Sequence, residues 1–169
     1  MKHILLLRHA KSSHEDSSLD DFDRPLANRG LKDAPMMGTF VKNTGYVPDL
    51  IISSPAKRAM QTAELFADAS GTGKADIKWN EDFYYGSSYD YLEEIQQCAE
   101  GLDCIMLVGH NPKMEETVSL LCSDQRSYIA RMPTAALVCF EHPAVQWEQV
   151  KEGTARIKWM MIPRLLKNN

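Results

Sequence analysis

The 169-residue chain lacks the sequence features of several protein classes. No apolar run reaches the roughly 18 to 20 residues that a membrane-spanning helix needs. The net charge is −4, whereas sequence-independent nucleic-acid binding needs a broad basic face. The N-terminal residues enter an apolar segment directly and leave no room for a signal peptide. We therefore expect a cytoplasmic protein that binds neither membranes nor nucleic acids.

The four cysteines are scattered, and their positions suggest neither disulfides nor a metal site. No two cysteines form a C-x-x-C pair, and each lies in or beside an apolar segment: Cys98, Cys104, Cys122 and Cys139. Such cysteines are usually small core residues, and a structural zinc site would show closer ligand pairs. The consecutive residues His14, Glu15 and Asp16 have no spacing that would bring them together on a metal. We expect no metal and no cofactor.

The chain also lacks linkers, internal repeats and low-complexity runs. Its length is that of one ordinary domain with a substantial core. The apolar content of 44% and the charged content of 25% are ordinary for a globular protein. We expect residues 1–169 to form a single domain.

Three apolar runs end in polar residues of the kinds found in binding sites. The run at residues 4–7 stops at Arg8 and His9, and the run at 104–108 leads through a glycine to His110. A third run, at 50–53, leads into a helix start that carries Arg58. Continuous apolar runs suit buried parallel strands, and ligands lie beyond the carboxyl ends of such strands. Two histidines and two arginines are thus expected at one rim; alternatively, each polar residue only marks where a strand reaches solvent.

The remaining segments predict the fold class. Helices are expected at residues 28–43, after Ser54 (N-cap) and Pro55 (first helical residue), at 89–99 and after Pro112. Strands are expected at 77–79, 134–140, 147–150 and 155–160, the last three in an antiparallel arrangement. The chain is therefore predicted to be α/β, a three-layer αβα sandwich with a mainly parallel central sheet and antiparallel C-terminal strands. The polar segment 11–24 is long for a connection, so it is either a binding loop or lid or a solvated surface loop.

The predicted rim favours phosphoryl chemistry. Two guanidinium groups suit a dianionic phosphoryl group, because each donates paired hydrogen bonds to its oxygens. Neighbouring cations lower the pKa of a histidine below about 6.5, which leaves the imidazole neutral and nucleophilic. Attack on phosphorus would give a phosphohistidine intermediate. The second histidine would donate to an equatorial oxygen in the transition state.

These segments resemble the histidine phosphatase superfamily (the RHG proteins, branch 1). The similar motifs, in order, are Leu-Leu-Arg8-His9-Ala-Lys-Ser12, Ser-Ser-Pro-x-x-Arg58-Ala-x-Gln61-Thr62 and Gly-His110-Asn-Pro. The resemblance implies a phosphoglycerate mutase-like fold in which His9 is the phosphorylated nucleophile. It also implies that Arg8 and Arg58 hold the phosphate and that His110 completes the pocket.

Further binding residues follow from the same resemblance. Ser12 and the backbone of Asn111 are expected to assist in binding. Within the superfamily, the chain is most similar to the SixA-type phosphohistidine phosphatases, which are short and carry Arg-Pro-Leu-Thr-x-x-Gly after the first loop. This segment begins here at Arg24, which is expected to reach the pocket unless it is a surface arginine. Ala27 replaces the threonine, so the cap of the following helix is in question, with Asn28 as a substitute.

The general acid is suggested by resemblance alone. Ester phosphatases and mutases of the superfamily place a glutamate in the loop that Asn80-Glu81-x-x-Tyr84 resembles. Glu81 is the candidate, with Asp82 behind it; the alternative is a solvated loop carboxylate. SixA-type enzymes are expected not to depend on such an acid. An imidazole protonates near neutral pH and leaves readily, whereas an alkoxide needs a proton delivered.

The favoured function is a metal-independent phosphatase, expected to be a monomer, that acts on phosphohistidine in a partner protein. A phosphate- or sulfate-type anion is expected in its pocket. The alternatives are a phosphatase for small phosphate esters such as sugar phosphates, and a non-catalytic module that recognises phosphate. A phosphoglycerate mutase is disfavoured, because those enzymes usually carry a longer helical insertion between the segments of Arg58 and His110.

Overall fold

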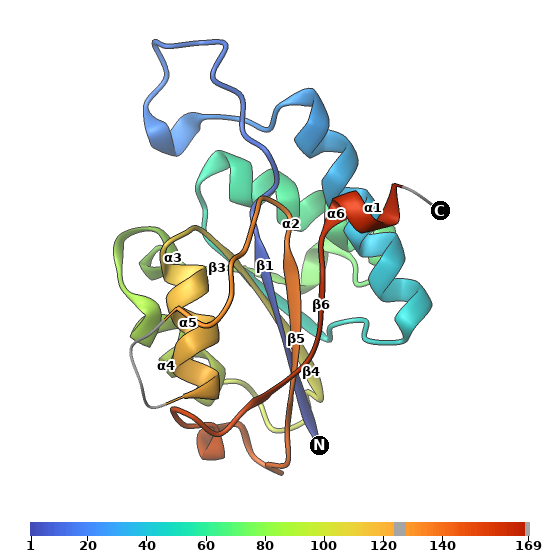
Figure 1. Ribbon diagram of the computed structural model, residues 1–169, viewed down its shortest axis with the longest axis vertical. Coiled ribbons are helices and arrows are strands. Elements are labelled where there is room, and N and C mark those ends of the chain that lie inside the picture. Colours follow the sequence, from blue (N-terminus) through green and yellow to red (C-terminus); the bar gives the residue numbers. More distant parts are fainter. Residues whose placement is uncertain (124–127, 168–169) are drawn as a thin grey trace.

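A six-stranded sheet with helices on both faces forms the centre of the molecule (Figure 1). The computed structural model describes residues 1–123 and 128–167. The strand order is β3-β2-β4-β1-β5-β6. The strands are β1 (Lys2–Arg8), β2 (Leu50–Ser53), β3 (Ile77–Trp79), β4 (Cys104–Gly109), β5 (Leu137–His142) and β6 (Arg156–Met161). The first four are mutually parallel, β5 is antiparallel to β1 and β6 is antiparallel to β5. The predicted mainly parallel sheet with antiparallel C-terminal strands is confirmed.

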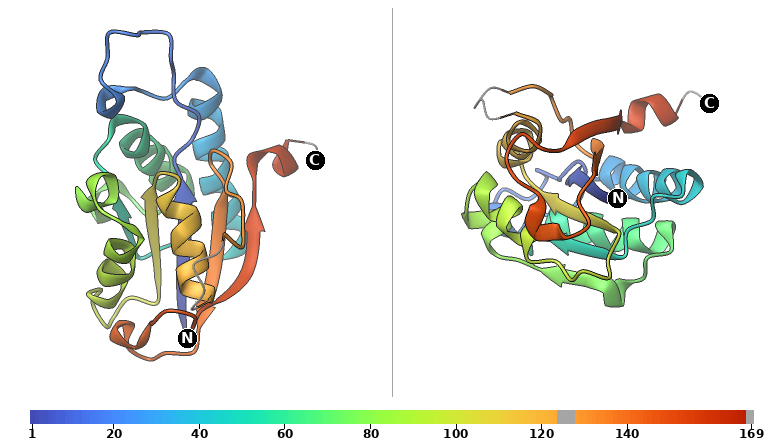
Figure 2. Two further views of the ribbon diagram at one scale, coloured as in Figure 1. Left: turned by 60° about the vertical axis from the view of Figure 1, so that its left-hand side comes forward. Right: turned by 90° about the horizontal axis from the view of Figure 1, so that it is seen from below.

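The helices form a layer on each face of the sheet, as Figure 2 shows from two directions. One face packs against α1 (Asn28–Thr44) and α2 (Lys57–Ser70), and the other against α3 (Asp82–Tyr85), α4 (Ser88–Gln96) and α5 (Lys113–Cys122). The apolar core between the sheet and α1 and α2 contains Leu5 and Leu7. The core on the opposite face, against α3, α4 and α5, contains Ile4 and Leu6. Successive strand residues point to opposite faces, so a strand covered on both sides needs such a continuous apolar run. The predicted three-layer αβα sandwich is confirmed.

Short elements complete the chain. They are η1 (Asp21–Asp23), η2 (Lys74–Asp76), η3 (Trp147–Gln149) and α6 (Pro163–Leu166), of which α6 contacts α1. Among the helices of the described residues, none is both long enough and apolar enough to cross a membrane.

Three parallel strands end at the same edge of the sheet. In the register of the sheet, Arg8 pairs with Gly109 and Ser53 pairs with Val108. The backbone ladder also continues beyond the strands. The His9 N–H donates to the Gly109 carbonyl at 3.0 Å, and the Ser54 N–H donates to the Val108 carbonyl at 3.0 Å. The segments that follow β1, β2 and β4 therefore start side by side.

The strand predicted at residues 147–150 is wrong, because the segment forms the 3-10 helix η3. Trp147 and Val150 are both buried, and the Trp147 indole donates to the Leu102 carbonyl at 3.0 Å. A spacing of three residues puts both apolar side chains on the same side of a 3-10 turn. The apolar residues at the two ends of this segment therefore marked one turn of helix.

Several predicted helix limits also differ from the structure. The helix after β2 starts at Lys57 with Ala56 as its N-cap, so the roles predicted for Ser54 and Pro55 are wrong. The Ser54 N–H extends the sheet, which holds that residue outside the helix. Helix α1 has Ala27 as its N-cap and no capping side chain, so Asn28 does not substitute for the missing threonine. Residues 82–85, predicted as loop, form the short helix α3.

Gly109 is required because the ring of Tyr91 lies against it. A Cβ at this position would lie 1.9 Å from the Tyr91 hydroxyl oxygen and 2.9 Å from Cζ. Tyr91 has little room to move away, since it stacks on Phe83 with centroids 3.9 Å apart and donates to the Phe83 carbonyl at 3.0 Å. A side chain at the end of β4 would therefore overlap Tyr91 unless that ring were displaced.

We predict that Gly109→Ala lowers the free energy of unfolding by about 1–3 kcal/mol, the usual cost of overpacking a core. Urea unfolding followed by circular dichroism measures this difference. Gly101→Ala is the matched control, because an added Cβ there would meet no atom within 4 Å. Equal stability of the two variants would contradict the close packing at Gly109.

Candidate active site

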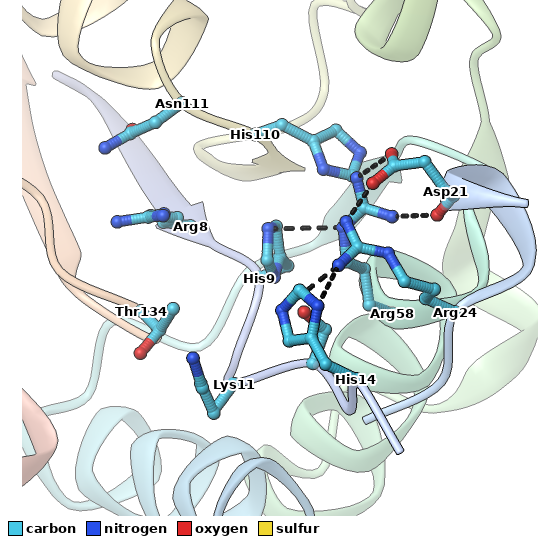
Figure 3. Close-up of a pocket in the computed structure, with 11 residues that line it drawn as sticks. Arg8, His9, Lys11, His14, Asp21, Arg24, Arg58, His110, Asn111 and Thr134 are labelled. Atoms are coloured by element: carbon cyan, nitrogen blue, oxygen red, sulfur yellow. Dashed lines mark hydrogen bonds and ion pairs between the residues drawn. The ribbon is translucent and has the colours of Figure 1, made fainter. Parts of the chain in front are cut away.

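A polar cavity of about 380 Å³ opens at the edge where the three parallel strands end (Figure 3). Its lining residues are Arg8, His9, Lys11, Ser12, His14, Asp21, Arg24, Arg58, His110, Asn111 and Thr134. All the site residues predicted from the sequence are among them, apart from Glu81. The structure therefore brings together residues from the ends of β1 and β4, the start of α2 and the segment 11–24.

His9 has a defined proton position. Its Nδ1 lies 2.7 Å from the Ala10 carbonyl oxygen, which only accepts hydrogen bonds, so Nδ1 carries the proton. The Nε2 atom therefore has the lone pair, and it accepts a hydrogen bond from Arg58 Nε at 3.3 Å. The Ala10 N–H donates to Thr62 Oγ1 at 3.0 Å, which anchors the same residue on α2. The nitrogen available for attack on a ligand is thus Nε2.

Burial keeps both pocket histidines neutral. Desolvation is the largest cause that lowers the pKa of His9 to about 3, and the charges of Arg58 and Arg8 lower it further against an opposing hydrogen bond to Ala10. Desolvation likewise lowers the pKa of His110 to about 2, followed by the neighbouring His9 and Arg58. The two rings tilt toward each other with centroids 5.0 Å apart. At neutral pH, the site therefore has two uncharged imidazoles among cations.

Arg8 is held by the segment that precedes β5. Its Nη1 donates to the Met132 carbonyl at 2.7 Å, and Asn111 Nδ2 donates to the same oxygen at 3.1 Å. Glu115 accepts from Asn111 Nδ2 and from the Met132 N–H, both at 2.8 Å. Arg8 Nε is buried and has no hydrogen-bond partner among the described residues. It is thus a donor available for a ligand in the pocket.

Asp21 of η1 forms ion pairs with two arginines of the pocket, Arg58 and Arg24. Its Oδ2 lies 2.8 Å from Arg58 Nη2 and accepts from the Tyr84 hydroxyl at 2.9 Å, while its carbonyl accepts from Arg58 Nη1 at 2.5 Å. Its Oδ1 pairs with Arg24, whose Nη1 also lies 2.8 Å from His14 Nδ1. A carboxylate of the chain therefore occupies the guanidinium groups that a bound anion would use.

The sequence reasoning did not identify Asp21, and it assigned no role to Tyr84. The Tyr84 ring packs edge-on against His110, with centroids 5.4 Å apart, and lies 5.9 Å from the Arg58 guanidinium carbon. Tyr84 lies in the segment whose resemblance suggested Glu81. Glu81 itself is exposed, its carbonyl accepts the first hydrogen bonds of α3, and it does not line the cavity. Its role as general acid remains a prediction.

The arrangement can bind an oxyanion and present a nucleophile to it. Arg8, Lys11, Arg24 and Arg58 face a cavity whose described lining contains one carboxylate, Asp21. Guanidinium groups bind phosphoryl oxygens through paired hydrogen bonds, and the neutral Nε2 of His9 is a nucleophile. Among the described residues, no group of three or more His, Cys, Asp or Glu side chains is placed to hold a metal ion.

The neutral histidines predict a loss of stability in mild acid. In the unfolded chain they bind protons near pH 6.5, whereas in the folded chain they do so only near pH 3 and pH 2. The unfolded state therefore binds more protons as the pH falls below 6.5. The free energy of unfolding should decrease by up to about 1.4 kcal/mol per pH unit for each histidine.

Urea unfolding between pH 6.5 and 5, where carboxylates contribute little, measures this slope. The double variant His9→Gln/His110→Gln retains the other histidines, and it should show a clearly shallower dependence. The same slope in both proteins would contradict neutral histidines in the folded state.

Asp21→Asn should strengthen the binding of inorganic phosphate. The substitution removes the negative charge that competes for Arg58 and Arg24 but keeps the size of the side chain. We expect the Kd to fall by roughly threefold to tenfold, equivalent to about 1 kcal/mol. Titration calorimetry measures it, with Asp23→Asn as the control from the same short helix but outside the cavity lining. Weaker binding by Asp21→Asn would mean that the carboxylate supports the arginines.

The sequence and the fold of the chain are both similar to those of known proteins. The sequence profile of the histidine phosphatase superfamily (branch 1) matches residues 4–84. An uncharacterised chloroplastic protein of Arabidopsis thaliana is 34% identical over 128 residues, which are 71% of this chain and 59% of that protein. The match thus covers less than two thirds of the plant protein's length.

Solved structures share the fold over nearly the whole chain. The SixA protein of Agrobacterium tumefaciens has a TM-score of 0.79 and 28% identity, covering 96% of this chain and 98% of that chain. A SixA protein histidine phosphatase solved with tungstate has a TM-score of 0.83 and 20% identity, covering 97% and 99%. The fold also occurs in a phosphoserine phosphatase of Entamoeba histolytica, with a TM-score of 0.65 and 15% identity, covering 95% and 96%. The chain is thus similar to the histidine phosphatase superfamily (branch 1) in the sequence of residues 4–84, and it has the fold of the SixA-type proteins.

Proposed function

We propose that this protein is a phosphatase that hydrolyses phosphohistidine on a partner protein, without a metal ion, and that residues 1–169 form its single domain. The observation that carries the proposal is the state of His9. Its ring is neutral, Nδ1 donates to the Ala10 carbonyl, and Nε2 holds a lone pair inside a group of arginines. In the proposal, His9 is the nucleophile and Arg8 and Arg58 bind the phosphoryl group.

The first step transfers the phosphoryl group to the enzyme. The lone pair of His9 Nε2 forms a bond to phosphorus, while the bond between phosphorus and the substrate nitrogen breaks. The released imidazole takes a proton from solvent and leaves as a neutral ring. Arg8, Arg58 and His110 stabilise the charge that builds on the equatorial oxygens, with Ser12, Arg24 and Asn111 as further binding residues.

The second step regenerates the enzyme. Water attacks phosphorus, the bond between phosphorus and His9 Nε2 breaks, and inorganic phosphate leaves with the proton that water releases. Splitting the reaction in this way replaces one difficult displacement by two easier ones. The ring of His9 returns to its neutral form with the proton still on Nδ1.

Phosphohistidine is favoured over a phosphate ester because the described lining of the cavity offers no free carboxylic acid. Asp21 is the one carboxylate in the described lining, and both of its oxygens are already engaged by Arg58, Arg24 and Tyr84. An alkoxide leaving group needs a proton from an acid, whereas imidazole protonates near neutral pH. A SixA protein histidine phosphatase of the same fold has been solved with tungstate, which supports the binding of an oxyanion by a protein of this fold.

Hydrolysis of a small phosphate ester remains the alternative, and a direct comparison separates the two. We expect kcat/KM to be at least about tenfold higher for a histidine-phosphorylated protein domain than for alkyl phosphate esters such as phosphoserine, since only an alkoxide leaving group needs an acid. Phosphate release measures both. Higher kcat/KM for the esters would overturn the proposed substrate.

In the same experiment, radiolabelled phosphate should appear on the wild-type enzyme as an acid-labile, base-stable adduct. His9→Ala should form no adduct and show no turnover, while keeping the circular dichroism spectrum of the wild type. Turnover by His9→Ala at the wild-type rate would overturn the mechanism.

A further inference from the structure

The two ring nitrogens of His110 have different surroundings. Nε2 lies 2.8 Å from the Ser54 hydroxyl oxygen. Nδ1 is buried and has no hydrogen-bond partner among the described residues. Ser54 is not part of the cavity lining, whereas the His110 ring is turned toward the cavity and His9 (Figure 3). Nδ1 is thus the nitrogen left for a ligand.

The interaction of His110 with a phosphoryl oxygen depends on which ring nitrogen carries the proton. Desolvation, followed by the neighbouring His9 and Arg58, lowers the pKa of His110 to about 2. The ring is therefore neutral at physiological pH, with one nitrogen that donates and one that accepts. An Nδ1–H would donate to a phosphoryl oxygen. An Nδ1 lone pair would instead repel it.

The contacts of Ser54 determine which nitrogen is protonated. Ser54 is completely buried, and its Oγ accepts the Ala56 N–H at 3.3 Å. His110 Nε2 is the one acceptor that the described residues offer to the hydroxyl proton. If Nε2 carried the ring proton, the hydroxyl proton would be buried without an acceptor, which costs about 1–3 kcal/mol. The favourable arrangement has the hydroxyl donating to Nε2 and the ring proton on Nδ1.

We propose that Ser54 is a positioning residue that fixes the tautomer of His110, so that its Nδ1–H points into the pocket and donates to the phosphoryl group. The inference rests on the proposed function, because it assigns His110 the task of stabilising charge on phosphoryl oxygens. Ser54 touches no substrate and acts only through the ring. Its contribution is largest in the transition state, when charge on these oxygens is greatest.

Steady-state kinetics with p-nitrophenyl phosphate and with a histidine-phosphorylated protein domain test the effect on catalysis. Ser54→Ala should lower kcat by about tenfold to a hundredfold, somewhat less than the usual loss of a direct oxyanion donor, and change KM by less than about threefold. Ser54→Thr keeps the hydroxyl group and should recover most of the lost kcat.

Ser53→Ala is the matched control. Ser53 is equally buried, but its hydroxyl donates to the Ser54 carbonyl at 3.0 Å and not to His110. This variant removes one buried hydroxyl from the neighbouring position, so it should keep the kcat of the wild type. If Ser53→Ala loses as much kcat as Ser54→Ala, the effect is one of packing and the proposal is overturned.

Nitrogen NMR of the imidazole provides a readout that needs no substrate. In the wild type, the ¹⁵N shifts of His110 should report a protonated Nδ1 and an unprotonated Nε2. In Ser54→Ala they should move toward a mixture of the two tautomers. A protonated Nε2 in the wild type, or an unchanged tautomer in Ser54→Ala, would overturn the proposal.

The combined results separate this proposal from the proposed function. Poor turnover of phosphohistidine together with the expected tautomers would refute the substrate assignment and leave the role of Ser54 intact. Rapid turnover of phosphohistidine with an unchanged tautomer in Ser54→Ala would do the reverse.

Discussion

The site depends on main-chain hydrogen bonds that extend the parallel sheet by one residue. The His9 N–H donates to the Gly109 carbonyl, and the Ser54 N–H donates to the Val108 carbonyl, both at 3.0 Å. Main-chain pairing fixes strand register, and a slip of one residue would turn each side chain to the opposite face. The approach of His9 to His110 therefore follows from the pairing of the buried strands.

The desolvation of the pocket acts on its cations and on its neutral bases together. Arg8 and Arg58 have pKa values lowered chiefly by desolvation, so holding their charge near the protein interior is unfavourable without an anion. The same desolvation keeps both histidines uncharged. A chain with a net charge of −4 thus contains a local site for an anion. The carboxylate of Asp21 pairs with Arg58 and Arg24 of this site, close to the neutral ring of His9.

The parts of this arrangement that follow from apolar patterning were predictable from the sequence. The runs that end at Arg8 and Gly109 are paired strands, and the predicted rim exists at their carboxyl ends. Asp21 was not predictable, because Asp20 and Asp23 lie beside it and only the path of the chain in space distinguishes them. The segment at Trp147 was misassigned because a short apolar spacing fits both a strand and one turn of helix.

The two sides of the pocket differ in how much structure must be disrupted to open them. β4 is paired with β1 on one side and β2 on the other, so solvent reaches its amide protons only when the sheet separates. Residues 13–24 are held by the bridge between Ser12 and Leu26 with the bond from the Ser13 N–H, by the packing of Phe22 on two tyrosine rings, and by the contacts of Asp21. Breaking these few bonds requires much less free energy than global unfolding. A local fluctuation of this segment would therefore open the pocket and leave the hydrogen-exchange protection of β1 and β4 intact.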